Sequence, residues 1–258
     1  MTKYKGYFID LDGTIYEGKN QMPTGRRFIE RLQAAGIPYL FVTNNSTRTP
    51  EYVAANLTNN HDIKTTPEQV YSSALATADY LDSITPVDGN RRVYAIGESG
   101  LKTALVDAGF ELSEVDPAYV VVGMDMQATY AMFETATLAI RNGAKYIATN
   151  MDTNIPNERG LVPGAGSLNA LVRYATGVEP FEIGKPRATI IEYALKKIGL
   201  QADEVVMVGD NYNTDIQAGI NAGMATLLTY TGISTHADIA QVTNKPTHEV
   251  ETLDDWEV

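Results

Sequence analysis

The amino-acid sequence predicts an α/β fold in which helices cover both faces of a parallel β-sheet. Short, continuous apolar runs alternate along the chain with segments of helical spacing, as is typical of parallel strands that are buried on both faces. Polar residues follow directly where several of these runs end, and ligands bind at that edge of such sheets. A single apolar run is also compatible with a buried helix, but the alternation as a whole predicts a doubly wound, Rossmann-like sheet.

The first elements of this sheet are expected near the start of the chain. Residues 7–9 form a short apolar run that predicts a strand. Residues 24–35 have the spacing of an amphipathic helix, with Thr24 expected as its N-cap and Gly36 as its C-cap. A second buried strand is expected over residues 39–42. Strand, helix and strand in this order indicate a parallel α/β unit.

The last part of the chain has the same organisation. The apolar run 205–208 predicts a strand, a helix is expected from about Asp215, and residues 226–229 predict another strand. We therefore expect the two ends of the chain to build one sheet together.

The middle of the chain has elements of its own, which indicates a second α/β domain. Strands are expected at residues 93–96, 119–122 and 145–149, and helices at 99–108, 127–142 and 165–175. A connection rich in turn residues at 82–92 and a second break at 179–181 flank this region. We therefore expect a core formed by residues 1–79 and 183–258, with an α/β domain inserted over residues 80–182.

Charge and composition exclude several classes of protein. The net charge of −12 over 258 residues argues against nucleic acid and anionic membranes as partners, because both require a broad basic surface. The absence of cysteine excludes disulfides, thiolate catalysis and cysteine metal sites. No apolar segment has the length of a signal peptide or a membrane span, so we expect a cytoplasmic protein. An acidic protein still binds small phosphates where a metal ion and a few cations make the site positive.

The first polar cluster, Asp10-Leu11-Asp12-Gly13-Thr14, directly follows the strand expected at 7–9. Asp10 and Asp12 are two positions apart, so an extended backbone places both carboxylates on the same side. Such carboxylates repel each other unless one is protonated or a cation lies between them, and Mg²⁺ prefers oxygen ligands of this kind. The alternative is a turn with two solvated aspartates.

Two further clusters offer groups that could bind a phosphate. In Thr43-Asn44-Asn45-Ser46, after the second strand, hydroxyl, amide and backbone N–H groups could hold phosphate oxygens, although an ordinary polar turn has the same composition. Lys185, between Gly184 and Pro186, could offer its ammonium to a phosphate if Pro186 is the first residue of a helix. The alternative for Lys185 is a solvated surface side chain.

The fourth cluster runs from Gly209 to Asp215 and contains two more carboxylates. Asp210 closes the strand expected at 205–208, and Asp215 lies near the start of the following helix. Negative charge is favoured at that end of a helix, so a helix-capping role for Asp215 is the alternative to a role in the site.

These four clusters, in this order, resemble the four motifs of the haloacid dehalogenase (HAD) superfamily of phosphotransferases. The full chain resembles its NagD-like branch, subfamily IIA, which is related to sugar-phosphate and p-nitrophenyl phosphatases. The resemblance extends over essentially the whole chain. It includes an α/β cap of the C2 type inserted between the second and third motifs, which corresponds to residues 80–182.

The resemblance implies a magnesium-dependent phosphatase in which Asp10 is the nucleophile and Asp12 the general acid and base. Asp10 would form an aspartyl-phosphate while Asp12 protonates the leaving alcohol, and Asp12 would then activate the water that hydrolyses this intermediate. Histidine has no part in this scheme. All three histidines lie outside the clusters and are expected to be surface or packing residues: His61, His236 and His248.

The resemblance also implies roles for the remaining residues of the clusters. Thr43, Asn44 and Asn45 would hold the transferring phosphoryl group, and Lys185 would neutralise charge on the nucleophile and the phosphate. Asp210 would bind Mg²⁺ together with Asp10 and the backbone carbonyl of Asp12. Asp215 would support the metal without binding it.

Small phosphorylated metabolites are the implied substrates, with sugar or acid-sugar phosphates favoured by the resemblance. Their selection is expected from the inserted domain, where the polar stretch from 149–154 through 163–167 is either the part that faces the core or an ordinary connection. Two alternative functions stay open, a phosphomutase of the same superfamily and a non-catalytic, receiver-like module phosphorylated on aspartate. A homo-oligomer is compatible with the sequence.

Overall fold

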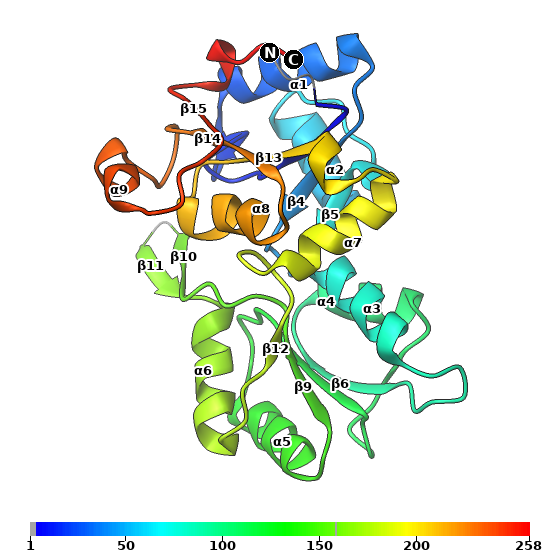
Figure 1. Ribbon diagram of the computed structural model, residues 1–258. Coiled ribbons are helices and arrows are strands. Elements are labelled where there is room, and N and C mark those ends of the chain that lie inside the picture. The colour runs from blue at the N-terminus through cyan, green and yellow to red at the C-terminus, as the bar shows by residue number, and fades with distance from the viewer. Residues whose placement is uncertain (1–3, 158) are drawn as a thin grey trace. The chain divides into compact units, whose positions relative to one another are not determined.

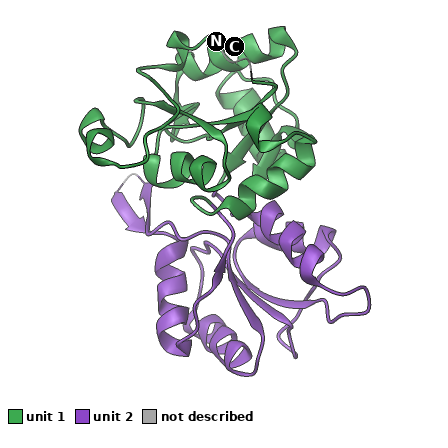
Figure 2. Cartoon of the chain, viewed as in Figure 1, with its two compact units in different colours: residues 1–43, 50–71, 185–258 green, residues 44–49, 72–184 purple. Residues whose placement is uncertain are grey.

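The computed structural model describes residues 4–157 and 159–258, which form two compact units (Figure 2). Unit 1 contains the chain up to Thr43 together with Pro50–Tyr71 and Lys185–Val258, and unit 2 contains Asn44–Thr49 and Ser72–Gly184. The boundary expected between residues 79 and 80 lies inside helix α3 (Ser73–Ile84), which belongs to unit 2. The second boundary lies after Gly184, two residues beyond the expected position.

Unit 1 is built on a sheet with strand order β15-β14-β13-β1-β4-β5 (Figure 1). Its strands are β1 (Gly6–Ile9), β4 (Tyr39–Thr43), β5 (Val70–Ser72), β13 (Val205–Gly209), β14 (Ala225–Thr229) and β15 (His248–Val250). β1 pairs in parallel with β4 and β13, and β14 pairs in parallel with β13 and β15. The strand predictions for both ends of the chain are thus confirmed to within one residue.

Helices cover both faces of this sheet, as predicted. Side chains of α1 (Pro23–Ala35) and α2 (Pro50–Asn60) pack with Val206 and Val208 in one apolar cluster. Met207, which points to the opposite face, lies against α8 (Gln217–Asn221). α8 packs in turn against α7 (Ala188–Ile198). The remaining elements of unit 1 are the strands β2 (Tyr16–Glu17) and β3 (Asn20–Gln21) and the helix α9 (His236–Gln241).

The helix starts differ from the sequence prediction in three places. α1 begins at Pro23 with Met22 as its N-cap, instead of Thr24, because the fixed φ of proline suits the first helical position. Its C-cap is Gly36, as predicted, with φ of 66°. Pro186 is not the first residue of α7, because the extended Arg187 (ψ 144°) separates the two. The helix expected from Asp215 is a π-helical turn, η3 (Tyr212–Ile216), followed by α8.

Unit 2 has its own sheet, with strand order β12-β9-β8-β6-β7 and parallel pairing throughout its described strands. The strands are β6 (Arg92–Ile96), β7 (Glu111–Leu112), β8 (Tyr119–Val122), β9 (Lys145–Ala148) and β12 (Phe181–Glu182). The helices are α3, α4 (Ser99–Asp107), α5 (Tyr130–Arg141) and α6 (Ala165–Thr176). This confirms the expected second α/β arrangement in the middle of the chain.

The two faces of the second sheet are covered by different helices. Side chains of α5 and α6 form one apolar cluster with alternate residues of β6 and β8. Right-handed crossovers place α4, between β6 and β7, on the other face, where it packs against α3. After β9 the chain forms an antiparallel hairpin, β10 (Asn154–Asn157) and β11 (Gly160–Pro163), within the stretch predicted to select substrates. In the described parts of the chain, no helix combines the length and apolar character needed to cross a membrane.

Candidate active site

The sheet of unit 1 brings three carboxylates from distant parts of the sequence together at its carboxyl edge. Asp10 directly follows β1, and Asp210 directly follows the neighbouring strand β13. Asp215 lies in the π-helical turn η3. One carboxylate oxygen from each of the three lies within 4.8 Å of the other two. The site is therefore formed where polar residues follow adjacent parallel strands.

Lys185 lies among these carboxylates and is buried. Its Nζ donates hydrogen bonds to Asp10 Oδ1 at 2.6 Å, Asp215 Oδ1 at 2.7 Å and the carbonyl oxygen of Val42 at 2.9 Å. The side chain is 2% exposed, so it is not the solvated surface lysine of the alternative interpretation. Asp215 also accepts the backbone N–H of Asn211 through Oδ2 at 3.1 Å. It therefore caps its own turn and also pairs with Lys185.

Burial and mutual repulsion control the ionisation of the site. Burial raises the pKa of Asp10 well above its usual range, and the pairing with Lys185 lowers it only in part. Burial and the neighbouring Asp215 raise the pKa of Asp210 to about 6. Burial lowers the pKa of Lys185, but Asp10 and Asp215 more than offset this effect and raise it overall. Three carboxylates against one ammonium leave a surplus of negative charge that a cation would balance.

Two glycines allow the chain to approach these carboxylates closely. Gly13 has φ of 87°, and a Cβ there would lie 2.5 Å from Asp210 Oδ2. A Cβ on Gly209 would lie 2.3 Å from the Cβ of Asp215. Both distances are shorter than side chains tolerate, so packing requires both glycines, and the positive φ of Gly13 adds a backbone reason at that position.

The carboxylate of Asp12 is separate from this cluster. Its side chain is exposed and accepts the backbone N–H of Gly18 at 2.9 Å. The metal-ligand role predicted for Asp12 involves its backbone carbonyl, not this side chain. An exposed carboxylate can exchange protons with solvent, which suits an acid and base more than a structural counter-ion.

The residues after β4 are divided between the two units. Thr43 is the last residue of β4 and is buried in unit 1. Asn44 and Asn45 belong to unit 2, and their side chains make contacts there. Asn44 Nδ2 donates to Asp152 Oδ2 at 3.0 Å, whereas Asn45 Oδ1 accepts from the N–H and the hydroxyl of Thr47 at 2.9 and 2.7 Å.

Several contacts around Asp210 were not predicted from the sequence. Thr14 Oγ1 donates to Asp210 Oδ1 at 3.1 Å, and the N–H of Ile233 donates to Asp210 Oδ2 at 2.8 Å. Thr231 Oγ1 donates to the carbonyl oxygen of Gly13 at 2.8 Å. The segment 230–234 follows β14, the neighbour of β13. Applying the strand-end argument to β14 as well would have pointed to this segment.

The three histidines lie outside the carboxylate site. His61 is buried and stacks on Tyr16, with ring centroids 4.5 Å apart. His236 is exposed and pairs with Glu251, and His248 forms a hydrogen bond with the hydroxyl of Tyr4. These positions agree with the expected surface and packing roles.

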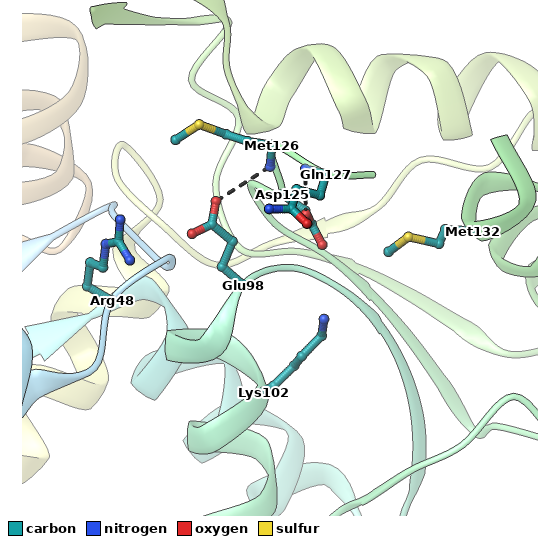
Figure 3. A pocket seen from close by; sticks show the side chains of 7 residues that line it. All are labelled: Arg48, Glu98, Lys102, Asp125, Met126, Gln127 and Met132. Atoms are coloured by element: carbon teal, nitrogen blue, oxygen red, sulfur yellow. Dashed lines mark hydrogen bonds between the residues drawn. The ribbon is translucent and has the colours of Figure 1, made fainter. Parts of the chain in front are cut away.

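A cavity of about 600 Å³ lies within unit 2 (Figure 3). It is found where the strand order reverses between β6 and β8, and its lining residues are Arg48, Glu98, Lys102, Asp125, Met126, Gln127 and Met132. Two cations and two carboxylates balance in this lining, so the cavity has no net charge to attract a phosphate. None of the residues predicted for the phosphatase site lines it.

Comparison with known proteins identifies the family. The sequence model for haloacid dehalogenase-like hydrolases matches residues 7–111, and a second HAD hydrolase-like model matches residues 182–256. The chain is 46% identical over 256 residues to the 5'-nucleotidase YutF of Bacillus subtilis (strain 168), covering 99% of this chain and 98% of that protein. The chain belongs to the haloacid dehalogenase-like hydrolases.

Two further relatives place the chain within this family. It is 47% identical over 256 residues to an acid sugar phosphatase of Staphylococcus aureus (strain USA300), covering 99% of this chain and 97% of that protein. The structure of NagD from E. coli K-12 superimposes with a TM-score of 0.92 at 32% identity, covering 99% of each chain. The resemblance to NagD-like phosphatases of subfamily IIA, drawn from the four clusters, is confirmed.

Proposed function

We propose that the chain is a magnesium-dependent phosphomonoesterase that hydrolyses small phosphorylated metabolites through an aspartyl-phosphate on Asp10. The observation that carries this proposal is the pairing of buried Lys185 with Asp10 and Asp215 beside a third carboxylate, Asp210. A buried ammonium in contact with a candidate nucleophile stabilises negative charge as it forms. Membership of a phosphatase branch of the hydrolase family supports the same conclusion.

The donor set of the carboxylate cluster fits a divalent cation. Its donors are carboxylate oxygens, which Mg²⁺ prefers, and three carboxylates carry more negative charge than the single ammonium of Lys185 offsets. Asp10, Asp210 and the backbone carbonyl of Asp12 would hold the ion. When bound, it would supply positive charge against the phosphoryl oxygens. Asp215 would act indirectly, since it holds Lys185 in place.

Asp10 and Asp12 carry out the two bond-making steps. Asp10 Oδ1 is bound to Lys185, so Oδ2 is the oxygen that attacks phosphorus. The bond from phosphorus to the alcohol oxygen breaks, and protonated Asp12 gives its proton to that oxygen. In the second step Asp12, now ionised, takes a proton from water. The water oxygen attacks phosphorus, the bond to Asp10 breaks, and inorganic phosphate is released.

The remaining predicted residues would hold the phosphoryl group during transfer. Thr43, Asn44 and Asn45 would bind the oxygens of this group. Lys185 would offset the negative charge on the phosphoryl group and on Asp10. Most of the catalytic gain in phosphoryl transfer comes from such positioning and charge stabilisation. We also propose that the inserted region, residues 80–182, selects the leaving group.

Sugar and acid-sugar phosphates are the proposed substrate class, with nucleoside monophosphates next. The supporting observation is the naming of two relatives, an acid sugar phosphatase and a 5'-nucleotidase, each about equally similar to this chain. The test is phosphate release from p-nitrophenyl phosphate and from a panel of such metabolites, with Mg²⁺ and with a chelator. Asp10→Asn, which keeps the shape of the side chain, is the control.

We expect turnover that depends on Mg²⁺ and is abolished in Asp10→Asn, while circular dichroism shows an unchanged fold. Wild-type turnover in Asp10→Asn would remove Asp10 from its role. Return of the phosphoryl group to another position of the substrate, without release of phosphate, would identify a phosphomutase. A stable phosphorylated form without turnover would identify a receiver-like module.

A further inference from the structure

We propose that Asp152 is a positioning residue for the reaction, acting through the side chain of Asn44. Asp152 lies in unit 2, outside the four sequence clusters, and is separated from Asn44 by 108 residues. It would hold the loop Asn44–Thr49 in the conformation that receives the phosphoryl group. This inference rests on the proposed function, because phosphoryl binding by that loop is part of it.

One carboxylate oxygen of Asp152 accepts two amide groups. Asn44 Nδ2 donates to Asp152 Oδ2 at 3.0 Å, and Asn150 Nδ2 donates to the same oxygen at 2.7 Å. Hydrogen bonds to a charged acceptor are about twice as strong as those between neutral groups. The carboxylate therefore defines which end of the Asn44 amide faces Asp152.

The opposite end of the Asn44 amide is in close contact with backbone. A Cβ placed on Gly184 would lie 2.6 Å from Asn44 Oδ1, so the glycine leaves just enough room for this oxygen. The Asn44 side chain is thus held by Asp152 on one side and limited by Gly184 on the other. An amide flip would direct Oδ1 toward the Asp152 carboxylate and lose the hydrogen bond.

The rest of the loop is held in the same unit by other contacts. The carbonyl oxygen of Asn44 accepts the hydroxyl of Ser73 at 2.7 Å, and the carbonyl oxygen of Thr47 accepts the N–H of Gly100 at 3.0 Å. Asn45 closes a local turn through its two bonds to Thr47. Against this background, the bond from Asn44 to Asp152 orients the first residue after Thr43.

Misplacement of a phosphoryl-binding group by about 1 Å can lower the rate about 100-fold. We therefore expect Asp152→Ala and Asn44→Ala each to lower kcat/KM for p-nitrophenyl phosphate by about 10- to 100-fold at saturating Mg²⁺. Inhibition by orthovanadate, a mimic of the transferring phosphoryl group, should weaken by a similar factor. The Mg²⁺ concentration for half-maximal activity should stay within about two-fold of the wild type, because Asp152 is not one of the carboxylates that would hold the ion.

The double variant provides the decisive comparison. If Asp152 acts through Asn44, Asp152→Ala combined with Asn44→Ala loses about as much activity as the worse single variant. Losses that multiply would overturn the proposal. Asp152→Asn keeps an oxygen that can accept both amides, and it should retain activity to within about five-fold. Asp82→Ala, which removes an exposed carboxylate of the same unit, is the matched control and should match the wild type.

The proposal can be tested even if Asp152→Ala does not fold. Asn44→Ala removes the same hydrogen bond from the other side, and activity within about three-fold of the wild type would contradict the positioning role. The dependence of kcat/KM on pH should have the same shape in wild type and Asp152→Asn. Loss of its acidic or basic side in the variant would show that Asp152 transfers a proton instead of positioning Asn44. A wild-type enzyme that releases no phosphate would refute the proposed function, whereas an active enzyme with independent losses would refute only the positioning role.

Discussion

Replacement of Lys185 by methionine is the most direct test of the electrostatic argument. The substitution keeps an unbranched side chain that is one atom shorter and removes the ammonium that Asp10 and Asp215 share. The two ion pairs measure 2.6 and 2.7 Å, and the side chains of Lys185 and Asp215 are each 2% exposed, against 13% for Asp10. The variant therefore leaves two carboxylates in a buried site without their counter-charge.

The expected loss of stability follows from this burial. Removing one member of a buried ion pair costs about 3–5 kcal/mol, because the partner stays desolvated without compensation. For a protein of this size, each kcal/mol lowers Tm by about 2–4 °C, so we expect Tm to fall by roughly 6–20 °C. Loss of a buried charge that stabilises the reacting phosphoryl group should also lower kcat by about 10²- to 10³-fold.

Scanning calorimetry measures Tm and guanidinium unfolding measures the free energy of unfolding, both near neutral pH in the presence of a chelator. Asp215→Asn added to Lys185→Met should recover part of the loss, because it neutralises one of the carboxylates left unpaired. The reasoning is refuted if Lys185→Met unfolds within about 1 kcal/mol of the wild type. It is also refuted if Asp215→Asn destabilises the variant as much as it destabilises the wild type.

Two further predictions concern Asp210 and its contact with Gly13. In the metal-free protein the pKa of Asp210 is raised from 3.8 to about 6, so between these values the folded state holds more protons than the unfolded chain. The contribution of this group to stability is therefore lost as pH rises from about 4 to 6. Mg²⁺ competes with that proton, so it should raise Tm more at about pH 7.5 than at about pH 5, and equal shifts would contradict the assignment. At Gly13, φ is 87° and an added Cβ would lie 2.5 Å from Asp210 Oδ2. Gly13→Ala should therefore lower the free energy of unfolding by about 1–3 kcal/mol and weaken Mg²⁺ activation. Unchanged unfolding and unchanged activation would show that the contact is not needed.

The strands that carry the site were predictable because their signal is local. β1, β4, β13 and β14 are continuous apolar runs that end within one residue of the predicted positions. A strand buried on both faces must be apolar along its whole length, so its ends can be read from the sequence. The polar clusters after β1 and β13 then follow from the rule that parallel strands share one carboxyl edge.

The helix starts were less predictable, because neighbouring residues compete for the same position. Thr24 is an acceptable N-cap, yet Pro23 occupies the first helical turn and moves the start of α1 to its own position. Arg187 is extended, so the helix after Lys185 begins later than expected. Such differences of one or two residues change no assignment in the site.

The sequence by itself determined the chemical types at the site and the strands that present them. Tertiary structure decided which of these groups meet: Lys185 is buried between Asp10 and Asp215, although a lysine beside glycine and proline is ordinarily solvated. It also placed Asn44 against Asp152, 108 residues away. Periodicity and side-chain type act over a few residues, whereas burial and the pairing of charges depend on distant segments that only the folded chain brings together.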